Sequence, residues 1–146
     1  MPSSSLSYVG YADGDSHHTR HIASTSWVLY TPKSELLDSG GIFLGSATNN
    51  VAEYMSVIQL LMEETSRDIS NLLVRLDSQL IIMQLNNHYR VRHQVLLRYF
   101  LRVRLLECQF QTITFEHVPR EFNALAPGIS SACLQYAAAN KLEPPA

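Results

Sequence analysis

The sequence predicts an α/β domain built on a five-stranded mixed sheet with helices on its faces. Three strand-like segments follow one another near the N-terminus, and two more are separated by helical patterns. Short connections favour antiparallel pairing of the first three strands, whereas strands entered through helices favour parallel pairing. With 146 residues and 46% hydrophobic content, the chain is long enough for one domain with its own core. We expect this domain to span residues 1–146, with flexible ends at 1–5 and 141–146.

The first three segments show the alternation that is typical of strands. The first covers about residues 6–13 and meets Asp13-Gly14, a pair that favours a turn. The second covers about 22–31 and ends before Pro32, and the third covers about 35–44. Gly40-Gly41 within the third segment indicates a local irregularity in that strand.

The remaining segments alternate between helical and strand patterns. Residues 48–65 carry apolar side chains too densely and over too long a run for a strand, and the start of this segment resembles a helix cap. Residues 71–77 form a short apolar run that suits a buried parallel strand. Helices are expected over about 78–87, 91–108 and 124–140, with a strand over about 110–118.

The cysteine content and the N-terminal segment indicate in which compartment the protein is expected. Cys108 and Cys133 form no disulfide framework, zinc spacing or redox motif, which fits a reducing compartment. The N-terminus has neither a basic start nor a long apolar run, so we expect no signal peptide and no membrane span. The expected location is intracellular, in the cytoplasm or the nucleus. The net charge of −2 does not exclude an anionic partner, because five arginines between residues 90 and 104 have no acidic residue among them.

Three carboxylates lie at the ends of predicted elements. Asp13 ends the first strand, Glu53 lies in the first turn of the first helix, and Asp77 ends the fourth strand. Each has a structural explanation when taken alone. Asp13 could begin an Asp-Gly turn, Asn50 and Glu53 could form a capping box, and Asp77 could cap the next helix.

Taken together, the same carboxylates indicate a metal site. If the first and fourth strands are neighbours, Asp13 and Asp77 come side by side, and a helix over the sheet could bring Glu53 to them. Clustered carboxylates repel one another unless cations neutralise them, and hard oxygen ligands suit Mg²⁺ or Mn²⁺. Such a site favours metal-assisted phosphoryl chemistry.

These residues also carry a family resemblance. The stretches "DGDS", "TNNVAEY", "DSQLI" and "HVPREFNALA" resemble the successive motifs of the type 1 ribonuclease H family, in the short form of prokaryotes, plants and retroelement-derived proteins. The resemblance runs from about Tyr8 to Ala139. It implies a ribonuclease H fold and hydrolysis of the RNA strand of an RNA–DNA hybrid. It further implies that Asp13, Glu53 and Asp77 are metal-binding and catalytic, with Asp13 bridging two Mg²⁺ ions.

The last motif departs from the family pattern. The family has Arg-Glu-x-Asn-x-x-Ala-Asp, and here Pro127 takes the place of the final acid. Proline is well accepted in a first helical turn, so the fold need not suffer. Two interpretations therefore stay open. One is a ribonuclease attenuated by loss of the fourth acid, with one metal site. The other is a catalytically inactive module that binds nucleic acid or acts as an interaction scaffold.

Two groups of residues are candidates for holding nucleic acid. The resemblance implies that Thr48, Asn49 and Asn50 meet the sugars and phosphates of the hybrid, with Gln79 as a weaker candidate for the same surface. Helix capping explains the first group equally well, and both roles can coexist. Arg98 and Arg102 lie four residues apart, on one helical face, where they could grip phosphate without sequence preference. A merely solvated helix face explains them about as well.

Overall fold

The computed structural model describes residues 6–17 and 22–123. Within these ranges the elements are β1 (Tyr8–His17), β2 (Ile22–Tyr30), β3 (Leu36–Gly45), α1 (Asn49–Thr65), β4 (Asn71–Leu76), α2 (Gln79–Leu85), α3 (Gln94–Glu107), β5 (Thr112–His117) and the short 3₁₀ helix η3 (Arg120–Phe122). The order agrees with the prediction as far as it can be followed. The helix expected over 124–140 lies outside the described residues, as do the expected flexible ends.

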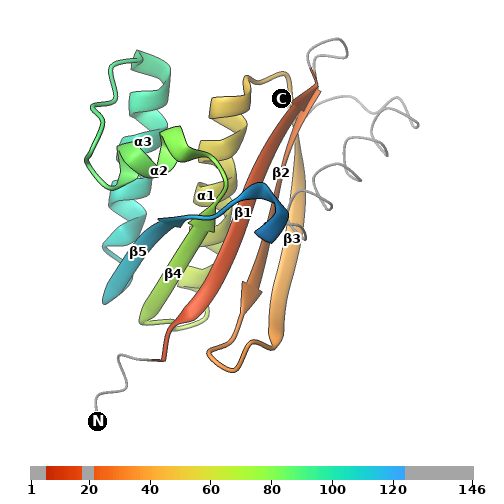
Figure 1. Ribbon diagram of the computed structural model, residues 1–146, viewed down its shortest axis with the longest axis vertical. Helices are drawn as coiled ribbons and strands as arrows, with labels where there is room; N and C mark the ends of the chain where they lie inside the picture. The colour runs from red at the N-terminus through yellow and green to blue at the C-terminus, as the bar shows by residue number, and fades with distance from the viewer. Residues whose placement is uncertain (1–5, 18–21, 124–146) are drawn as a thin grey trace.

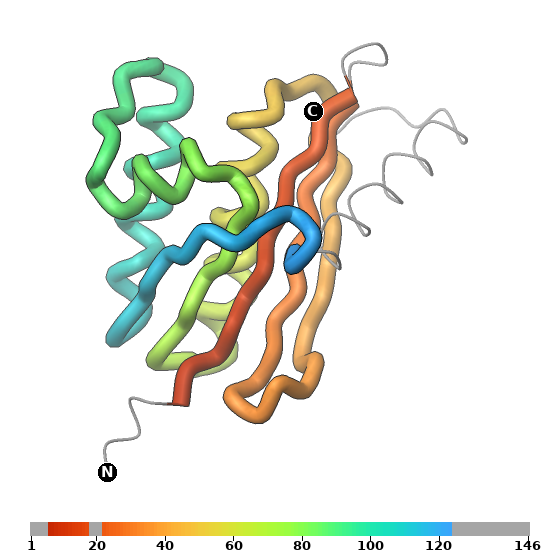
Figure 2. The backbone as a smooth tube through the Cα atoms, viewed as in Figure 1, coloured from red at the N-terminus to blue at the C-terminus, as the bar shows by residue number. Residues whose placement is uncertain are grey.

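The five strands form one mixed sheet in the order β3-β2-β1-β4-β5 (Figure 1). β2 pairs antiparallel with β1 and with β3, whereas β4 pairs parallel with β1 and with β5. This confirms the predicted sheet and makes β1 and β4 neighbours. After β5 the backbone crosses β4 and reaches β1, as the tube in Figure 2 shows.

Helices α1, α2 and α3 cover one face of the sheet (Figure 1). α1 packs on β1 and β2, and α3 packs on α1. Burying one large aliphatic side chain in such a layer contributes about 1.5–3 kcal/mol. The buried side chains between these elements include Leu29, Tyr54, Val57, Ile58, Leu61, Leu72, Val74 and Leu76. None of the helices in the described part of the chain is long and apolar enough to cross a membrane.

The first strand does not end where the sequence suggested. β1 continues through Asp13 and Gly14 to His17, and these two residues pair with Ser26 and Thr25 of β2. The expected Asp-Gly turn is therefore wrong. Gly14 is needed for space instead, because a Cβ atom there would lie 2.1 Å from the carbonyl carbon of Ala52 in α1. The glycine lets the helix backbone approach the strand.

The irregularity expected at Gly40-Gly41 is also absent from the described strand. These residues pair in register with Trp27 and Ser26, and the shifts in the β2–β3 ladder lie between Ala23 and Ser24 and between Leu29 and Tyr30. A Cβ atom at Gly40 would lie 2.3 Å from the Trp27 ring. The small residue makes room for the indole rather than breaking the strand.

A buried carboxyl near the end of α1 gives the fold a pH dependence. The Glu64 side chain is completely buried and lies 2.9 Å from the Arg67 guanidinium, which also lies 3.5 Å from Asp38 of β3. Burial raises the pKa of Glu64 to about 7, and the charge of Asp38 acts in the same direction, whereas Arg67 opposes it.

Replacing Glu64 with Gln is expected to stabilise the protein above neutral pH. When the pKa of an acid is higher in the folded state than in the unfolded state, the protein loses stability as pH rises between the two values. Here that range runs from about 4.5 to about 7. Glu64→Gln removes that loss, so its stability relative to the natural chain should rise by about 2–3 kcal/mol between pH 4.5 and pH 8. Urea unfolding at both pH values measures this difference. Glu63→Gln, at an exposed neighbouring position, is the control. If the free energy of unfolding changed with pH in the same way in both variants, the raised pKa of Glu64 would not be the cause.

A cluster of carboxylates between β1, α1 and β4

The structure brings Asp13, Glu53 and Asp77 together. One carboxylate oxygen from each residue lies within 4.8 Å of the other two. The residues come from three elements: Asp13 from β1, Glu53 from α1, and Asp77 from the position directly after β4. Asp15 and Glu121, which lie close by in the sequence, are not part of this group.

The sheet register explains why the two aspartates meet. The parallel ladder of β1 and β4 ends at the pair Tyr11 and Arg75, and each aspartate lies two residues further along its chain. A cross-strand hydrogen bond joins this last pair, because Arg75 donates to the Tyr11 hydroxyl at 2.8 Å. The carboxyl ends of parallel strands are common sites for ligands in open sheets.

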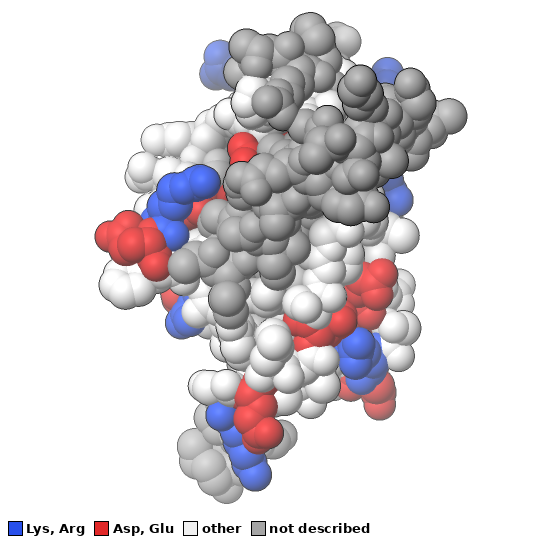
Figure 3. Space-filling view, turned by 90° about the vertical axis from the view of Figure 1, so that its right-hand side faces the viewer, with Lys and Arg blue, Asp and Glu red and all other residues white. Residues whose placement is uncertain are grey.

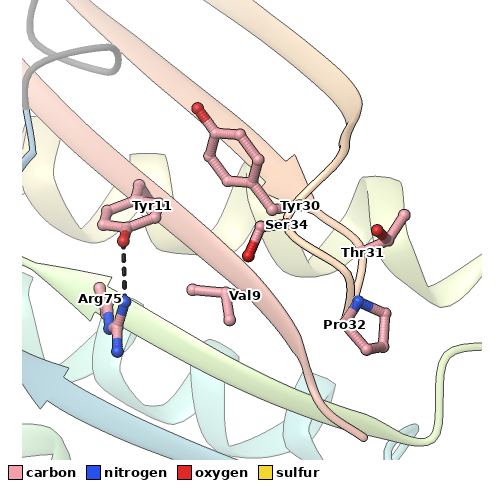
Figure 4. Close-up of a pocket in the computed structure, with 7 residues that line it drawn as sticks. All are labelled: Val9, Tyr11, Tyr30, Thr31, Pro32, Ser34 and Arg75. Carbon is pink, nitrogen blue, oxygen red and sulfur yellow. Dashed lines mark hydrogen bonds between the residues drawn. The ribbon is translucent and has the colours of Figure 1, made fainter.

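The same two side chains border a shallow pocket of about 220 Å³ (Figure 4). Arg75 also forms an ion pair with Glu116 at 2.9 Å, so its charge is already neutralised by the protein. Tyr30 meets the Tyr11 ring edge-on, with 5.9 Å between the ring centroids. These contacts hold β1, β2 and β4 together two residues before the aspartates. Among the described residues that line the pocket, the one cation, Arg75, is already paired.

Glu53 reaches the cluster because α1 lies directly against Gly14. The Gly14 amide donates a hydrogen bond of 3.1 Å to Glu53 Oε1. Ser16 adds a second tie, since its hydroxyl donates to the Ala47 carbonyl at 2.6 Å in the segment before α1. The approach of helix to strand is therefore held by one hydrogen bond at the glycine itself and by another two residues further along β1.

Among the helix caps considered from the sequence, Thr48 is confirmed, whereas Asn50 and Asp77 are not the caps. Thr48 caps α1, where its side chain accepts from the Val51 amide, and Ser78 caps α2, where its side chain accepts from the Ile81 amide. The capping roles considered for Asn50 and Asp77 are wrong. Glu53 lies beyond the first turn of α1, not within it. Since neighbouring residues supply the caps, the carboxylates of Glu53 and Asp77 remain available for another role.

The cluster is buried and poorly compensated by the protein. Asp13 is 1% exposed and Glu53 is 7% exposed. Both Asp13 oxygens and Glu53 Oε2 are buried with no hydrogen-bond donor from the described residues. Burial raises the pKa of Asp13 to about 6, and the charge of Asp77 acts in the same direction. Burial and the charge of Asp13 raise the pKa of Glu53 well above its usual value.

These properties fit a bound divalent cation. Buried oxygen atoms without donors carry a desolvation penalty that a metal ion would offset. Carboxylates from three elements offer the hard oxygen ligands that such ions prefer. The position expected for a fourth acid, at Pro127, lies outside the described residues.

The candidate nucleic-acid residues divide into two places. Thr48, Asn49 and Gln79 are exposed, and Asn50 is partly exposed, at the N-terminal ends of α1 and α2. These ends flank Glu53 and Asp77 in the chain, so this set lies close to the carboxylates.

Arg98 and Arg102 are exposed on α3, away from the cluster. Arg102 lies 3.6 Å from the Met62 sulfur, and Met62 is about 13 Å along α1 from Glu53 at the usual helical rise. The structure does not bring these two arginines to the carboxylates. On the side of the molecule drawn in Figure 3, positive and negative side chains are interspersed rather than gathered into one basic patch.

Two further residues have roles that the sequence did not reveal. Arg104 lies over the Phe100 ring at 4.6 Å, pairs with Glu107 and donates to the Leu85 carbonyl, so it holds α3 against the end of α2. Asn123 donates to Asp77 Oδ2 at 3.2 Å. In the sequence, Asn123 stood out only as the asparagine of the Arg-Glu-x-Asn stretch. No local pattern predicts that its side chain bonds to Asp77.

Comparison with known proteins agrees with this architecture. The family model described as "Reverse transcriptase-like" matches residues 11–133. A bifunctional protein of Mycobacterium tuberculosis is 32% identical over 128 residues, which are 87% of this chain. The match spans only 35% of the length of that relative.

Solved structures give similar matches. The ribonuclease H1 of the archaeon Halobacterium salinarum is 32% identical with a TM-score of 0.86, and the match covers 89% of this chain and 98% of that one. LC11 ribonuclease H1, solved in complex with an RNA/DNA hybrid, is 27% identical with a TM-score of 0.84, and the match covers 90% and 99% of the two chains. Because the family model matches most of its length and a ribonuclease H1 at 32% identity aligns with 89% of it, the chain belongs to the ribonuclease H-like family.

Proposed function

We propose that this chain is a divalent-metal-dependent ribonuclease H domain that hydrolyses the RNA strand of RNA–DNA hybrids. One observation carries the proposal: Asp13, Glu53 and Asp77 from three separate elements lie within 4.8 Å of one another. The buried oxygens of Asp13 and Glu53 Oε2 lack hydrogen-bond donors among the described residues, as expected for atoms that coordinate a cation. The hybrid bound to the related LC11 ribonuclease H1 supports the same substrate class.

In this proposal the three carboxylates hold Mg²⁺ or Mn²⁺. When bound, such an ion activates a water molecule and stabilises the charge on the leaving oxygen. Asp13 lies in β1, where it is paired with Ser26 of β2, so the sheet sets the position of this ligand. Thr48, Asn49, Asn50 and Gln79 would contact the sugar 2′-hydroxyls and phosphates of a hybrid from the adjacent helix ends.

A second candidate is a module that binds nucleic acid without cutting it. Pro127 favours this candidate, because the family pattern has an acid at that position and proline offers no ligand. Mg²⁺ readily keeps water in its coordination shell, so loss of one carboxylate weakens a site without removing it. We therefore expect attenuated turnover rather than none.

A cleavage assay distinguishes the two candidates. Purified protein with Mn²⁺ should cut a labelled RNA–DNA hybrid in the RNA strand, and Asp77→Asn should not. Binding of the hybrid with no cleavage by either protein would favour the inactive module. Equal cleavage by both proteins would point to a contaminating nuclease.

Restoring the fourth acid should raise activity. Pro127→Asp supplies a carboxylate at the position where the family pattern has one, so we expect cleavage in Mg²⁺ to rise at least tenfold. Single-turnover rates on the same hybrid measure the change, with Pro127→Asn as the uncharged control. No increase, with folding and hybrid binding intact, would mean that more than this ligand is lost.

Arg98 and Arg102 are proposed to add sequence-independent affinity for phosphate. If they contact the backbone of a long hybrid, binding should weaken as salt rises, and the double change to Ala should reduce the salt slope by about one to two. Fluorescence anisotropy over 50–200 mM salt measures both quantities. An unchanged slope would leave these residues as a solvated face of α3.

A further inference from the structure

Asn123 is buried beside the carboxylate cluster and donates hydrogen bonds to one of its carboxylates and to the backbone carbonyl that precedes another. Its side chain is 1% exposed, and Nδ2 donates to the Ala12 carbonyl at 3.1 Å and to Asp77 Oδ2 at 3.2 Å. Both partners are pure acceptors, so only the NH₂ side of the amide can face them. Chemistry thus fixes the amide orientation.

The amide fills the place where β1 and β4 separate. Their ladder ends at Tyr11 and Arg75, one residue before Ala12. On the other side of β4, the Leu76 carbonyl accepts from the Val118 amide at 2.9 Å. The Ala12 carbonyl instead accepts a hydrogen bond from the side chain of Asn123. This bond replaces the backbone hydrogen bond that a continued β1–β4 ladder would supply.

A tight turn presents this side chain. In η3 the Phe122 amide donates to the Pro119 carbonyl at 2.9 Å, and the Asn123 amide donates to the Arg120 carbonyl at 3.0 Å. Arg120 itself is exposed, and its guanidinium lies 3.9 Å from Asp77. The buried and closely bonded group is therefore Asn123, with Arg120 as a looser neighbour.

We infer that Asn123 is a positioning residue of the metal centre, which sets the Asp77 carboxylate relative to Asp13 through one amide. This inference rests on the proposed function. Asp77 follows the end of β4 and has no ladder partner of its own. The amide joins it to the carbonyl directly before Asp13. Hydrogen bonds that orient ligating carboxylates typically change metal affinity roughly 10- to 100-fold when removed.

Direct metal titration tests the inference. Mn²⁺ binding, followed by the electron paramagnetic resonance signal of free Mn²⁺, should weaken roughly 10- to 100-fold in Asn123→Ala. Asn86→Ala is the matched control, because Asn86 Nδ2 donates to a strand carbonyl, that of Phe115, at the same 3.1 Å but away from the cluster. This control should bind Mn²⁺ as the natural chain does. In cleavage assays Asn123→Ala should need more metal, with its rate recovering at saturating Mn²⁺.

The possible outcomes separate this inference from the proposed function. Unchanged Mn²⁺ affinity in Asn123→Ala, while the natural chain binds, would overturn the positioning role and leave the metal function standing. Failure of the natural chain to bind Mn²⁺ would overturn both. Asn123→Leu keeps the volume without the donor and serves if the alanine variant does not fold. Equal loss of affinity in Asn86→Ala would mean that general destabilisation is responsible, which also contradicts the inference.

Discussion

Asp13→Asn is expected to abolish hybrid cleavage, by at least about 100-fold, while making the metal-free protein more stable. The Asp13 carboxylate is buried, has no donor among the described residues, and lies within 4.8 Å of two other acids. Removing its charge takes away a metal ligand and also relieves repulsion between buried carboxylates. Opposite changes in function and stability are the signature of a site that is strained until a cation binds.

Single-turnover cleavage and thermal unfolding in a chelator measure the two effects of this change. Asp15→Asn is the matched control, since it makes the same charge change two residues along β1 but outside the cluster. The control should keep cleavage within a few-fold of the natural chain. Lower stability of metal-free Asp13→Asn would show that the carboxylate stabilises the fold and would contradict the account.

Gly14→Ala is expected to cost about 3 kcal/mol or more of stability and to impair metal binding. The added methyl group would lie 2.1–2.3 Å from backbone atoms of Ala52 and Glu53, which cannot move without shifting α1. Overpacking of a core generally costs about 1–3 kcal/mol, and more where backbone must move. The shift would also carry Glu53 away from Asp13.

Gly10→Ala gives the matched comparison on the same face of β1. The three atoms nearest its methyl group would all belong to the Leu60 side chain, the closest at 2.7 Å, and a side chain can move more easily than backbone. We expect a cost of about 1 kcal/mol for this variant, with Mn²⁺ affinity unchanged. Urea unfolding and Mn²⁺ titration compare the two. Equal costs would mean that α1 is not pressed against Gly14.

The sequence was informative where local pattern and tertiary packing agree. The residues of α1 place Tyr54, Val57, Ile58 and Leu61 on one buried face, which is the spacing that predicts an amphipathic helix. The order of three antiparallel strands followed by helix-linked strands predicted the mixed five-stranded sheet, and the structure supplies the condition that β1 and β4 are neighbours. With that condition met, Asp13 and Asp77 come together as expected from the sequence.

Local rules failed where a distant segment decides the conformation. Asp-Gly favours a turn in isolation, yet β2 and α1 hold Asp13 and Gly14 in an extended strand. The cap of α1 could be assigned to Thr48 or Asn50 from spacing alone, and the structure selects Thr48. The bond from Asn123 to Ala12 spans 111 residues of sequence, so no local pattern could reveal it.

Anomalous scattering from a crystal soaked in Mn²⁺ tests the central claim most directly, namely that Asp13, Glu53 and Asp77 form a divalent-metal site. We expect an anomalous peak bonded to carboxylate oxygens of all three residues, at about 2.0–2.3 Å. The peak should disappear in Asp13→Asn. A saturating soak that leaves no peak among these carboxylates, with the protein folded as described, would contradict the account.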